Sequence, residues 1–190
     1  MGKLYFTLKE SFKAKKKLKA IRQKKHRLTS VTSLSPLLLQ KANVQYLALD
    51  FDGVLAAHGQ PLPSESIKNW LSTFCERFPQ EHIFILSNKP TLERKSYFEK
   101  YFPKIRFIDN VRKKPYPDGL QQIQTLAKCK SYEIALVDDR LLTGCLACIL
   151  AGAYPILITK PFSNFKRRPF QESFFGLLRW IEKKLFSIPS

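Results

Sequence analysis

Four short groups of polar residues have the types and the order that phosphoryl transfer needs. The groups are Asp50-Phe51-Asp52-Gly53, Ser87-Asn88, Lys114-Pro115 and Asp138-Asp139. A carboxylate that attacks a phosphate dianion meets charge repulsion, which a metal ion and a cationic side chain together can neutralise. Each group is common when it occurs alone, but their order along one chain predicts a single site for phosphate-ester chemistry.

Each of these side chains suits one part of the reaction. Asp50 is the predicted nucleophile, which would form an aspartyl-phosphate. Asp52 would protonate the leaving oxygen and then deprotonate the water that hydrolyses the intermediate. Ser87 and Asn88 would donate hydrogen bonds to phosphoryl oxygens. Lys114 would compensate the negative charge of the carboxylates and of the transferred group.

The late acidic pair predicts a metal site. Asp138 and Asp139, together with Asp50, offer the hard oxygen ligands that Mg²⁺ prefers. An Asp-Asp pair can also simply cap the helix that follows it. Gly53, next to the first two carboxylates, permits an unusual turn or a close backbone approach.

The elements around these groups alternate between strands and helices. Apolar strands are predicted over 44–49, 82–86, 105–108, 133–137 and 154–158. Helices are predicted over 64–78, 91–100, 117–129 and 141–152. Continuous apolar strands separated by helices are typical of a parallel sheet with helices on both faces, a Rossmann-like α/β fold. Asp50, Ser87 and Asp138 follow strands directly, and reacting groups gather at the carboxyl ends of such strands.

This order of groups resembles the haloacid dehalogenase (HAD) superfamily, whose motifs are Asp-x-Asp, Ser or Thr, Lys and an acidic pair. The resemblance covers residues 45–160. The runs Lys113-Lys114-Pro115 and Val137-Asp-Asp-Arg-Leu-Leu-Thr143 are similar to subfamily IIIA, the YqeG-like group, which includes the mitochondrial-type phosphatidylglycerophosphate phosphatases. The resemblance implies the HAD fold and magnesium-dependent phosphatase activity. It also implies Asp50 as nucleophile, Asp52 as acid/base, Ser87 as phosphate binder, Lys114 as charge stabiliser, and Asp139, Asp50 and the backbone carbonyl of Asp52 as magnesium ligands.

Two features depart from that pattern. Gly144 stands where the subfamily usually has a second acid, and Asp138 stands where it usually has a glycine. Asp138 would then take over the role of the missing acid. The second motif reads Ser-Asn-Lys-Pro rather than Ser-Asn-Asn. A phosphoacceptor receiver domain is the competing interpretation, but there the acidic pair precedes the phosphorylated Asp and the Lys comes last, whereas here the pair follows Lys114.

The formal charge of +18 is concentrated at the two ends of the chain. Residues 1–27 hold eleven Lys and Arg residues against one Glu, and residues 160–190 hold seven against two, while the remainder holds fifteen against twelve. Basic ends favour an anionic partner, either a lipid surface or nucleic acid. We therefore expect three regions: a basic amphipathic N-terminal extension and linker over 1–43, a HAD-like phosphatase domain over 44–160, and a basic, aromatic C-terminal amphipathic helix within 161–190.

Both ends contain helical patterns. A lysine-rich helix is predicted over 10–27, and a second helix over 169–187. In the first region Leu4, Leu8, Phe12, Leu18 and Ile21 fall on one half of the circumference, and in the second the stripe is Phe170, Phe174, Leu177, Leu178, Ile181 and Leu185. Such a stripe suits docking on the sheet as well as insertion into a bilayer surface. Phe175, Trp180 and Phe186 lie outside the stripe and favour the bilayer.

The remaining features bound the cellular setting. Four cysteines provide no disulfide framework for a chain of 190 residues, which indicates a reducing compartment. The pair Cys145 and Cys148 lacks the second pair that a zinc site needs. No apolar run is long enough to cross a bilayer. We expect a cytoplasmic protein, peripheral on the inner face of a membrane, although a basic, acid-poor start is also compatible with organelle targeting.

The spacing of the motifs bears on the substrate. Each interval between motifs is consumed by a helix and a strand, so no separate cap domain fits and an open site is expected. An open site with basic, apolar ends favours a lipid phosphate such as phosphatidylglycerophosphate at an anionic membrane surface. The alternatives are a nucleic-acid-binding or end-processing phosphatase, and a weakly active membrane-bound HAD scaffold, which Gly144 would explain.

Overall fold

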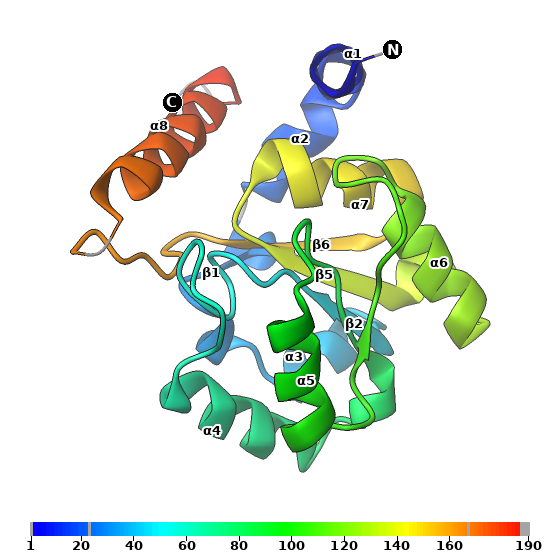
Figure 1. Ribbon diagram of the computed structural model, residues 1–190. Helices are drawn as coiled ribbons and strands as arrows, with labels where there is room; N and C mark the ends of the chain where they lie inside the picture. Colours follow the sequence, from blue (N-terminus) through cyan, green and yellow to red (C-terminus); the bar gives the residue numbers. More distant parts are fainter. Residues whose placement is uncertain (1, 23, 167, 187–190) are drawn as a thin grey trace.

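A six-stranded sheet forms the centre of the protein (Figure 1). The computed structural model describes residues 2–22, 24–166 and 168–186. All neighbouring strands are parallel, in the order β1-β6-β5-β2-β3-β4, which confirms the predicted α/β fold. The strands are β1 (Arg27–Leu28), β2 (Tyr46–Leu49), β3 (Ile83–Ile85), β4 (Arg106–Phe107), β5 (Ile134–Asp138) and β6 (Tyr154–Ile158).

Helices cover both faces of this sheet. In the described residues the helices are α1 (Lys3–Lys13), α2 (Lys15–Ile21), α3 (Pro36–Lys41), α4 (Glu65–Cys75), α5 (Leu92–Tyr101), α6 (Asp118–Ala127), α7 (Leu146–Ala151) and α8 (Pro169–Leu185). A π-helical turn, Leu141–Cys145, joins β5 to α7. The helix predicted over 141–152 therefore begins with one widened turn.

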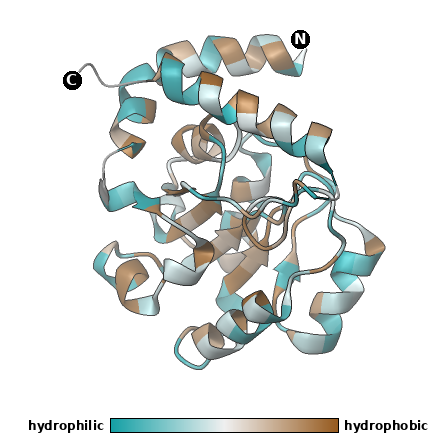
Figure 2. Cartoon of the chain, turned by 90° about the vertical axis from the view of Figure 1, so that its left-hand side faces the viewer, coloured by the Kyte–Doolittle hydropathy of each residue, from teal (hydrophilic) through white to brown (hydrophobic). Residues whose placement is uncertain are grey.

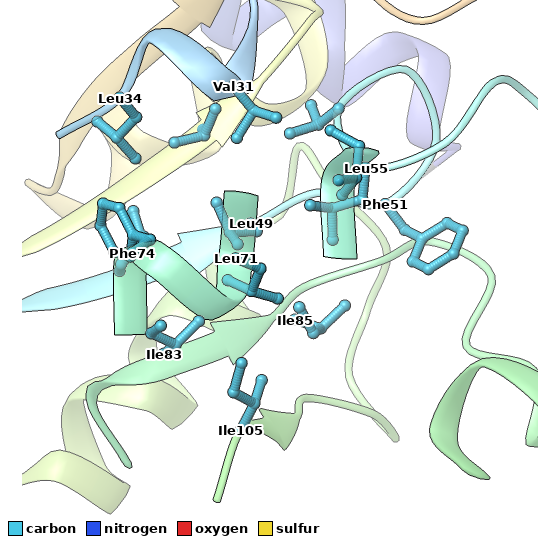
Figure 3. Packing of buried hydrophobic residues seen from close by; sticks show 14 of the residues in the cluster. Val31, Leu34, Leu49, Phe51, Leu55, Leu71, Phe74, Ile83, Ile85 and Ile105 are labelled. Carbon is cyan, nitrogen blue, oxygen red and sulfur yellow. The ribbon is translucent and has the colours of Figure 1, made fainter. Parts of the chain in front are cut away.

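Alternate strand residues enter different layers of the core. Leu47 and Leu49 of β2 pack with α3, α4 and α5 on one face, in the cluster that Figure 3 shows. Ala48, between them, packs with α6 and α7 on the other face. This period of two is what a parallel sheet buried on both faces produces. Because the strands are fixed from both sides, the loops at their carboxyl ends have rigid starting points.

The N-terminal region contributes directly to the fold. Val31, Leu34 and Leu39, from the segment expected as a linker, are buried in the main core. β1 adds a sixth strand, paired with β6, that the sequence pattern did not indicate. The lysine-rich helix predicted over 10–27 begins earlier, at Lys3, and is divided at Ala14 into α1 and α2. Its predicted end is wrong, because α2 ends at Ile21 and Arg27 belongs to β1. Its apolar residues therefore separate: Leu18 and Ile21 of α2 are buried, whereas Leu4, Leu8 and Phe12 of α1 are exposed.

The C-terminal helix α8 has its apolar side turned outward. The residues of its predicted stripe that are exposed are Phe170, Phe174, Leu177, Ile181 and Leu185, with Trp180 beside them. Its buried residues include Glu172 and Glu182, which lie toward the body of the protein. Figure 2 shows hydrophobic patches along α1 and α8, and both figures place these helices at the same end of the molecule. The predicted helix extends to 187, and residues 187–190 lie outside the described part of the chain.

Candidate phosphatase site

Three of the predicted residues meet around one buried ammonium group. Lys114 follows β4 and is only 2% exposed. Its Nζ lies 2.9 Å from Oδ1 of Asp50, at the end of β2, and 2.6 Å from Oδ2 of Asp138, at the end of β5. β2 and β5 are neighbours in the sheet, so their carboxyl ends bring the two acids together. The juxtaposition predicted from the order of the motifs is thus present.

A third carboxylate completes an acidic cluster. Oxygen atoms of Asp50, Asp138 and Asp139 lie within 4.8 Å of one another. Ligands on opposite sides of a Mg²⁺ ion are about 4.2 Å apart, so a small shift would let one ion contact all three. The donor set is all oxygen and strongly anionic, which fits Mg²⁺ rather than a softer metal. Asp139 also accepts a hydrogen bond of 2.8 Å from Arg179 of α8.

The buried position of the cluster shifts its proton equilibria. Burial raises the pKa of Asp50 well above the ordinary range, while Lys114 opposes that shift. Burial, and then the charge of Asp138, raises the pKa of Asp139 to about 7, against the influence of Arg179. Burial alone would lower the pKa of Lys114, but the charges of Asp138 and Asp50 outweigh it and the pKa is raised. The two carboxylates therefore favour the charged form of Lys114. The buried acids in turn favour the binding of a further cation, because it would offset their mutual repulsion.

Asp52 lies in the same loop but has different partners. Arg94 of α5 donates to Oδ1 at 2.8 Å and to Oδ2 at 3.1 Å, and the backbone N–H of Gly59 donates to Oδ1 at 3.1 Å. Burial alone would raise the pKa of Asp52, but the bonds and charge of Arg94 outweigh it and the pKa is lowered. The guanidinium carbon of Arg94 also lies 3.7 Å from the ring centre of Phe51. Asp52 is therefore held as a carboxylate in a defined orientation.

Ser87 and Asn88 connect these two groups of contacts. The Ser87 hydroxyl, after β3, accepts hydrogen bonds from Arg94 at 3.4 Å and from the backbone of Lys89 at 3.1 Å. The side-chain carbonyl of Asn88 accepts a bond of 2.9 Å from the backbone N–H of Lys114. Asn88 thus positions the loop that carries Lys114. All seven residues singled out in the sequence lie at this one edge of the sheet.

Two glycines leave room for the carboxylates. Gly53 has φ +85°, and a Cβ there would lie 2.9 Å from Cγ of Asp139. A Cβ on Gly144, in the π-helical turn, would lie 2.2 Å from Cγ of Asp138. No real side chain tolerates such an approach. The carboxylate of Asp138 therefore occupies the space that a side chain at position 144 would enter. This explains why an acid at position 138 occurs together with a glycine at position 144.

The expectation of an open site is wrong in one respect. No cap is inserted between the motifs, but α8 lies over the acidic cluster through its inner residues. Glu182 accepts two bonds from Arg140, at 2.8 and 2.5 Å, and one of 2.9 Å from the backbone N–H of Leu141. The side chain of Asp139 is only 1% exposed. A cavity of ≈40 Å³ remains where Asp139 faces Arg179.

Comparison with known families agrees with this geometry. The family described as mitochondrial PGP phosphatase matches residues 11–163. The chain belongs to this family. PGP phosphatase membership makes the protein a phosphoric monoester hydrolase of the HAD type, as the motifs predicted, and the family's description refers to mitochondria.

Other comparisons add little to the family assignment. A crystal structure of an uncharacterized protein from Corynebacterium glutamicum ATCC 13032 Kitasato is similar over 77% of this chain and 98% of its own, with 18% identity and a TM-score of 0.46. A comparison with curated proteins found no match. In the described residues, every helix is too short or too polar to cross a membrane. The match to the PGP phosphatase family ends before α8 begins.

Sequence reasoning missed the basic residues that hold the acids. Arg94 and Arg179 contact Asp52 and Asp139, yet they lie 42 and 40 positions away in the chain. Arg94 stands three residues after Thr91, which caps α5. The sequence therefore predicts that Arg94 lies in the first turn of that helix, but not that it contacts Asp52. The acids at 172 and 182 offered a signal, because two acids within an otherwise basic end suggest paired partners.

Proposed function

We propose that the protein removes the phosphomonoester from a lipid headgroup, phosphatidylglycerophosphate or a related lipid, at an anionic membrane surface. The observation that supports this most is that two helices beside the site turn their apolar residues to solvent. α8 exposes Phe170 at 90%, and α1 exposes Leu4 and Phe12 at 74% each. Exposed aromatic and aliphatic residues on basic helices are typical of helices that lie in a membrane interface.

The two helices lie next to the catalytic groups. Phe6 of α1 stacks on Tyr116, with ring centres 4.3 Å apart, two residues after Lys114. The pKa of Lys3 is lowered by burial and by the charges of Lys113, Lys114 and Arg140, so its ammonium group lies near theirs. α8 reaches the site through Arg179. An interface that held both helices would therefore present lipid headgroups to this end of the sheet.

The described contacts support a two-step transfer. Binding of the phosphate dianion beside Asp52 favours the protonated form of this carboxyl group, so Asp52 takes up a proton from solvent as the substrate binds. Asp50 then attacks phosphorus, and the bond to the lipid oxygen breaks as that oxygen takes this proton from Asp52. Asp52, now a carboxylate, takes a proton from water, which attacks phosphorus and releases Asp50 and inorganic phosphate. Lys114 compensates the charge throughout, and Ser87 and Asn88 orient the phosphoryl oxygens.

A divalent ion completes this proposal. Asp50, Asp138, Asp139 and the backbone carbonyl of Asp52 would hold Mg²⁺. When bound, the ion would offset the repulsion between the nucleophile and the phosphate dianion.

Replacing Arg94 with Met should move the acid limb of the pH–rate profile to higher pH. Without the guanidinium, the pKa of Asp52 rises, so Asp52 is protonated and unable to act as a base at a higher pH than in the wild type. The measurement is kcat against pH with a soluble aryl phosphate, whose leaving group needs little protonation. A purely structural role for Arg94 would lower kcat without moving that limb.

A vesicle assay tests the substrate. Phosphate release from phosphatidylglycerophosphate in anionic vesicles should fall about tenfold or more when Phe174 and Trp180 are both changed to Ser, because two inserted apolar side chains are lost. Hydrolysis of a soluble aryl phosphate should remain within about twofold of wild type.

The matched control is Leu37→Ser. Leu37 is 57% exposed, like Phe174, but lies in α3, which precedes β2 and so is at the opposite edge of the sheet. This change should leave vesicle activity intact. Equal loss on both substrates in the α8 variant would contradict interfacial action, and salt-sensitive dephosphorylation of DNA or RNA ends would favour the nucleic-acid alternative.

A further inference from the structure

We propose that α8 is a cap that closes the phosphatase site with a tethered cation, Arg179, and that an anionic bilayer releases this cap. The identity of the bilayer as the releasing partner rests on the proposed function. The closing contact rests on the described geometry alone.

A mixed stripe of charged and aromatic residues attaches α8 to the body of the protein. Its members recur every three or four residues: Glu172, Phe175, Arg179, Glu182 and, just after the helix, Phe186. Glu172 accepts a bond of 2.9 Å from the backbone N–H of Asn164, and Phe175 stacks on His58 with ring centres 4.0 Å apart. A helix that docks permanently on a core normally buries its apolar side. The two residues of α8 that are buried are both acids, Glu172 and Glu182, and Phe175 supplies the aromatic contact, so the docked position buries little of the apolar side.

The anchoring differs along the helix. At the C-terminal end, Phe186 is buried among α2 and the β5–α7 segment, and Arg22 donates to the carbonyl oxygens of Lys183 and Phe186 at 3.0 and 2.9 Å. At the other end, Glu172 and His58 face each other at 3.7 Å, and one buried polar atom of each has no hydrogen-bond partner. The first half of α8 is therefore the part that detaches most easily. Arg179 lies in the second half, so its withdrawal also requires the ion pair between Glu182 and Arg140 to break.

Arg179 opposes the binding of a divalent ion. Its guanidinium lies 2.8 Å from an oxygen of Asp139, one of the three carboxylates of the acidic cluster. Arg179 forms an ion pair with this third carboxylate, as Lys114 does with the other two. A divalent ion in the cluster would meet electrostatic repulsion from a guanidinium held so close. Docking of α8 and ion binding should therefore weaken each other, by the same factor in both directions.

Insertion of the exposed side of α8 into a bilayer would provide the free energy for release of the helix. Trp180 directly follows Arg179 and is 56% exposed, so any movement of the one displaces the other. Lys183 and Lys184 in the last turn favour an anionic surface. Insertion of the apolar residues removes them from water, which the docked position cannot do. An anionic bilayer is therefore the partner that fits both the charge and the apolar character of this surface.

The first test measures ion binding without turnover. Isothermal titration calorimetry with Mg²⁺ should give about tenfold tighter binding for Arg179→Gln than for wild type, since one charge-assisted hydrogen bond no longer competes. Lys183→Gln, which removes the same charge from an exposed position of the same helix, and Arg179→Lys, which keeps the charge, should both bind like wild type. Weaker binding by Arg179→Gln would overturn the proposal, because Arg179 would then serve to orient Asp139 as a ligand.

The second test follows α8 directly. The chain has two tryptophans, so Trp70→Phe leaves Trp180 as the reporter. With vesicles of phosphatidylglycerol and phosphatidylcholine, which carry no phosphomonoester, its emission should shift to the blue and the Mg²⁺ affinity should rise toward that of Arg179→Gln. Unchanged Mg²⁺ affinity despite a blue shift would overturn release of the cap. Neither test depends on lipid hydrolysis, so failure of the lipid substrate assay would leave both outcomes readable.

Discussion

Changing Asp50 to Asn should lower phosphate release from a soluble aryl phosphate roughly a thousandfold or more, because an amide cannot form the aspartyl-phosphate. The assay is Mg²⁺-dependent phosphate release by the purified protein. The amide keeps the size of the side chain and can still accept from Lys114, whose ammonium also lies 2.6 Å from Asp138. The fold should therefore persist, with a thermal midpoint near that of wild type.

The matched control for this change is Asp118→Asn. Asp118 pairs with Arg112 at the start of α6 and takes no part in the acidic cluster. It should retain full activity. Mg²⁺-dependent turnover by the wild type that disappears in Asp50→Asn would exclude the catalytically weak scaffold, whereas equal turnover by Asp50→Asn and wild type would refute the nucleophile.

The double variant Asp138→Gly/Gly144→Asp should recover the Mg²⁺ affinity and the stability that each single change lowers. Asp138→Gly removes one of the two carboxylates that pair with Lys114, and should weaken Mg²⁺ binding and activity. Gly144→Asp adds a side chain whose Cβ would lie 2.2 Å from Cγ of Asp138, so overpacking should lower the free energy of unfolding by about 1–3 kcal/mol. In the double variant the new carboxylate enters the space that Asp138 has left. Mg²⁺ affinity and thermal stability should then recover most of the loss.

Gly176→Ala is the control for adding a Cβ. A Cβ at that position of α8 would have no atom within 4 Å apart from the neighbouring residues and backbone of its own helix, so the change should be neutral or slightly stabilising. Thermal unfolding with and without Mg²⁺ compares all four variants. If the losses of the two single changes simply add in the double variant, the two positions do not share one carboxylate site.

The sequence predicts both the sheet and the site because the same segments define them. Apolar strands that end in Asp50, Ser87 and Asp138 define both the parallel sheet and the edge at which its functional groups meet. The position of Lys114 followed from the order of the motifs. Strand β1 could not be predicted, because two residues, Arg27 and Leu28, carry no periodicity.

The orientation of the terminal helices was beyond the sequence pattern. An apolar stripe at helical spacing shows that α8 has two sides, but not which side meets the protein. Two ion pairs determine which side of α8 faces the protein. Arg140 pairs with Glu182 of the helix, and Asp139 pairs with Arg179. Such pairs join residues about 40 positions apart, so only the three-dimensional arrangement reveals them.

The burial of α2 limits how much of the N-terminal region a peptidase could remove without damage to the core. Leu18 and Ile21 are buried against the β5–α7 segment, and β1 closes one edge of the sheet. A peptidase that trims the basic start of the chain, as happens to imported organelle precursors, could remove most of α1 without touching a buried apolar side chain. A cut beyond Ala14 would remove part of the hydrophobic core. If such trimming occurs, the mature enzyme must therefore retain the lysine-rich α2, and with it a strongly cationic surface.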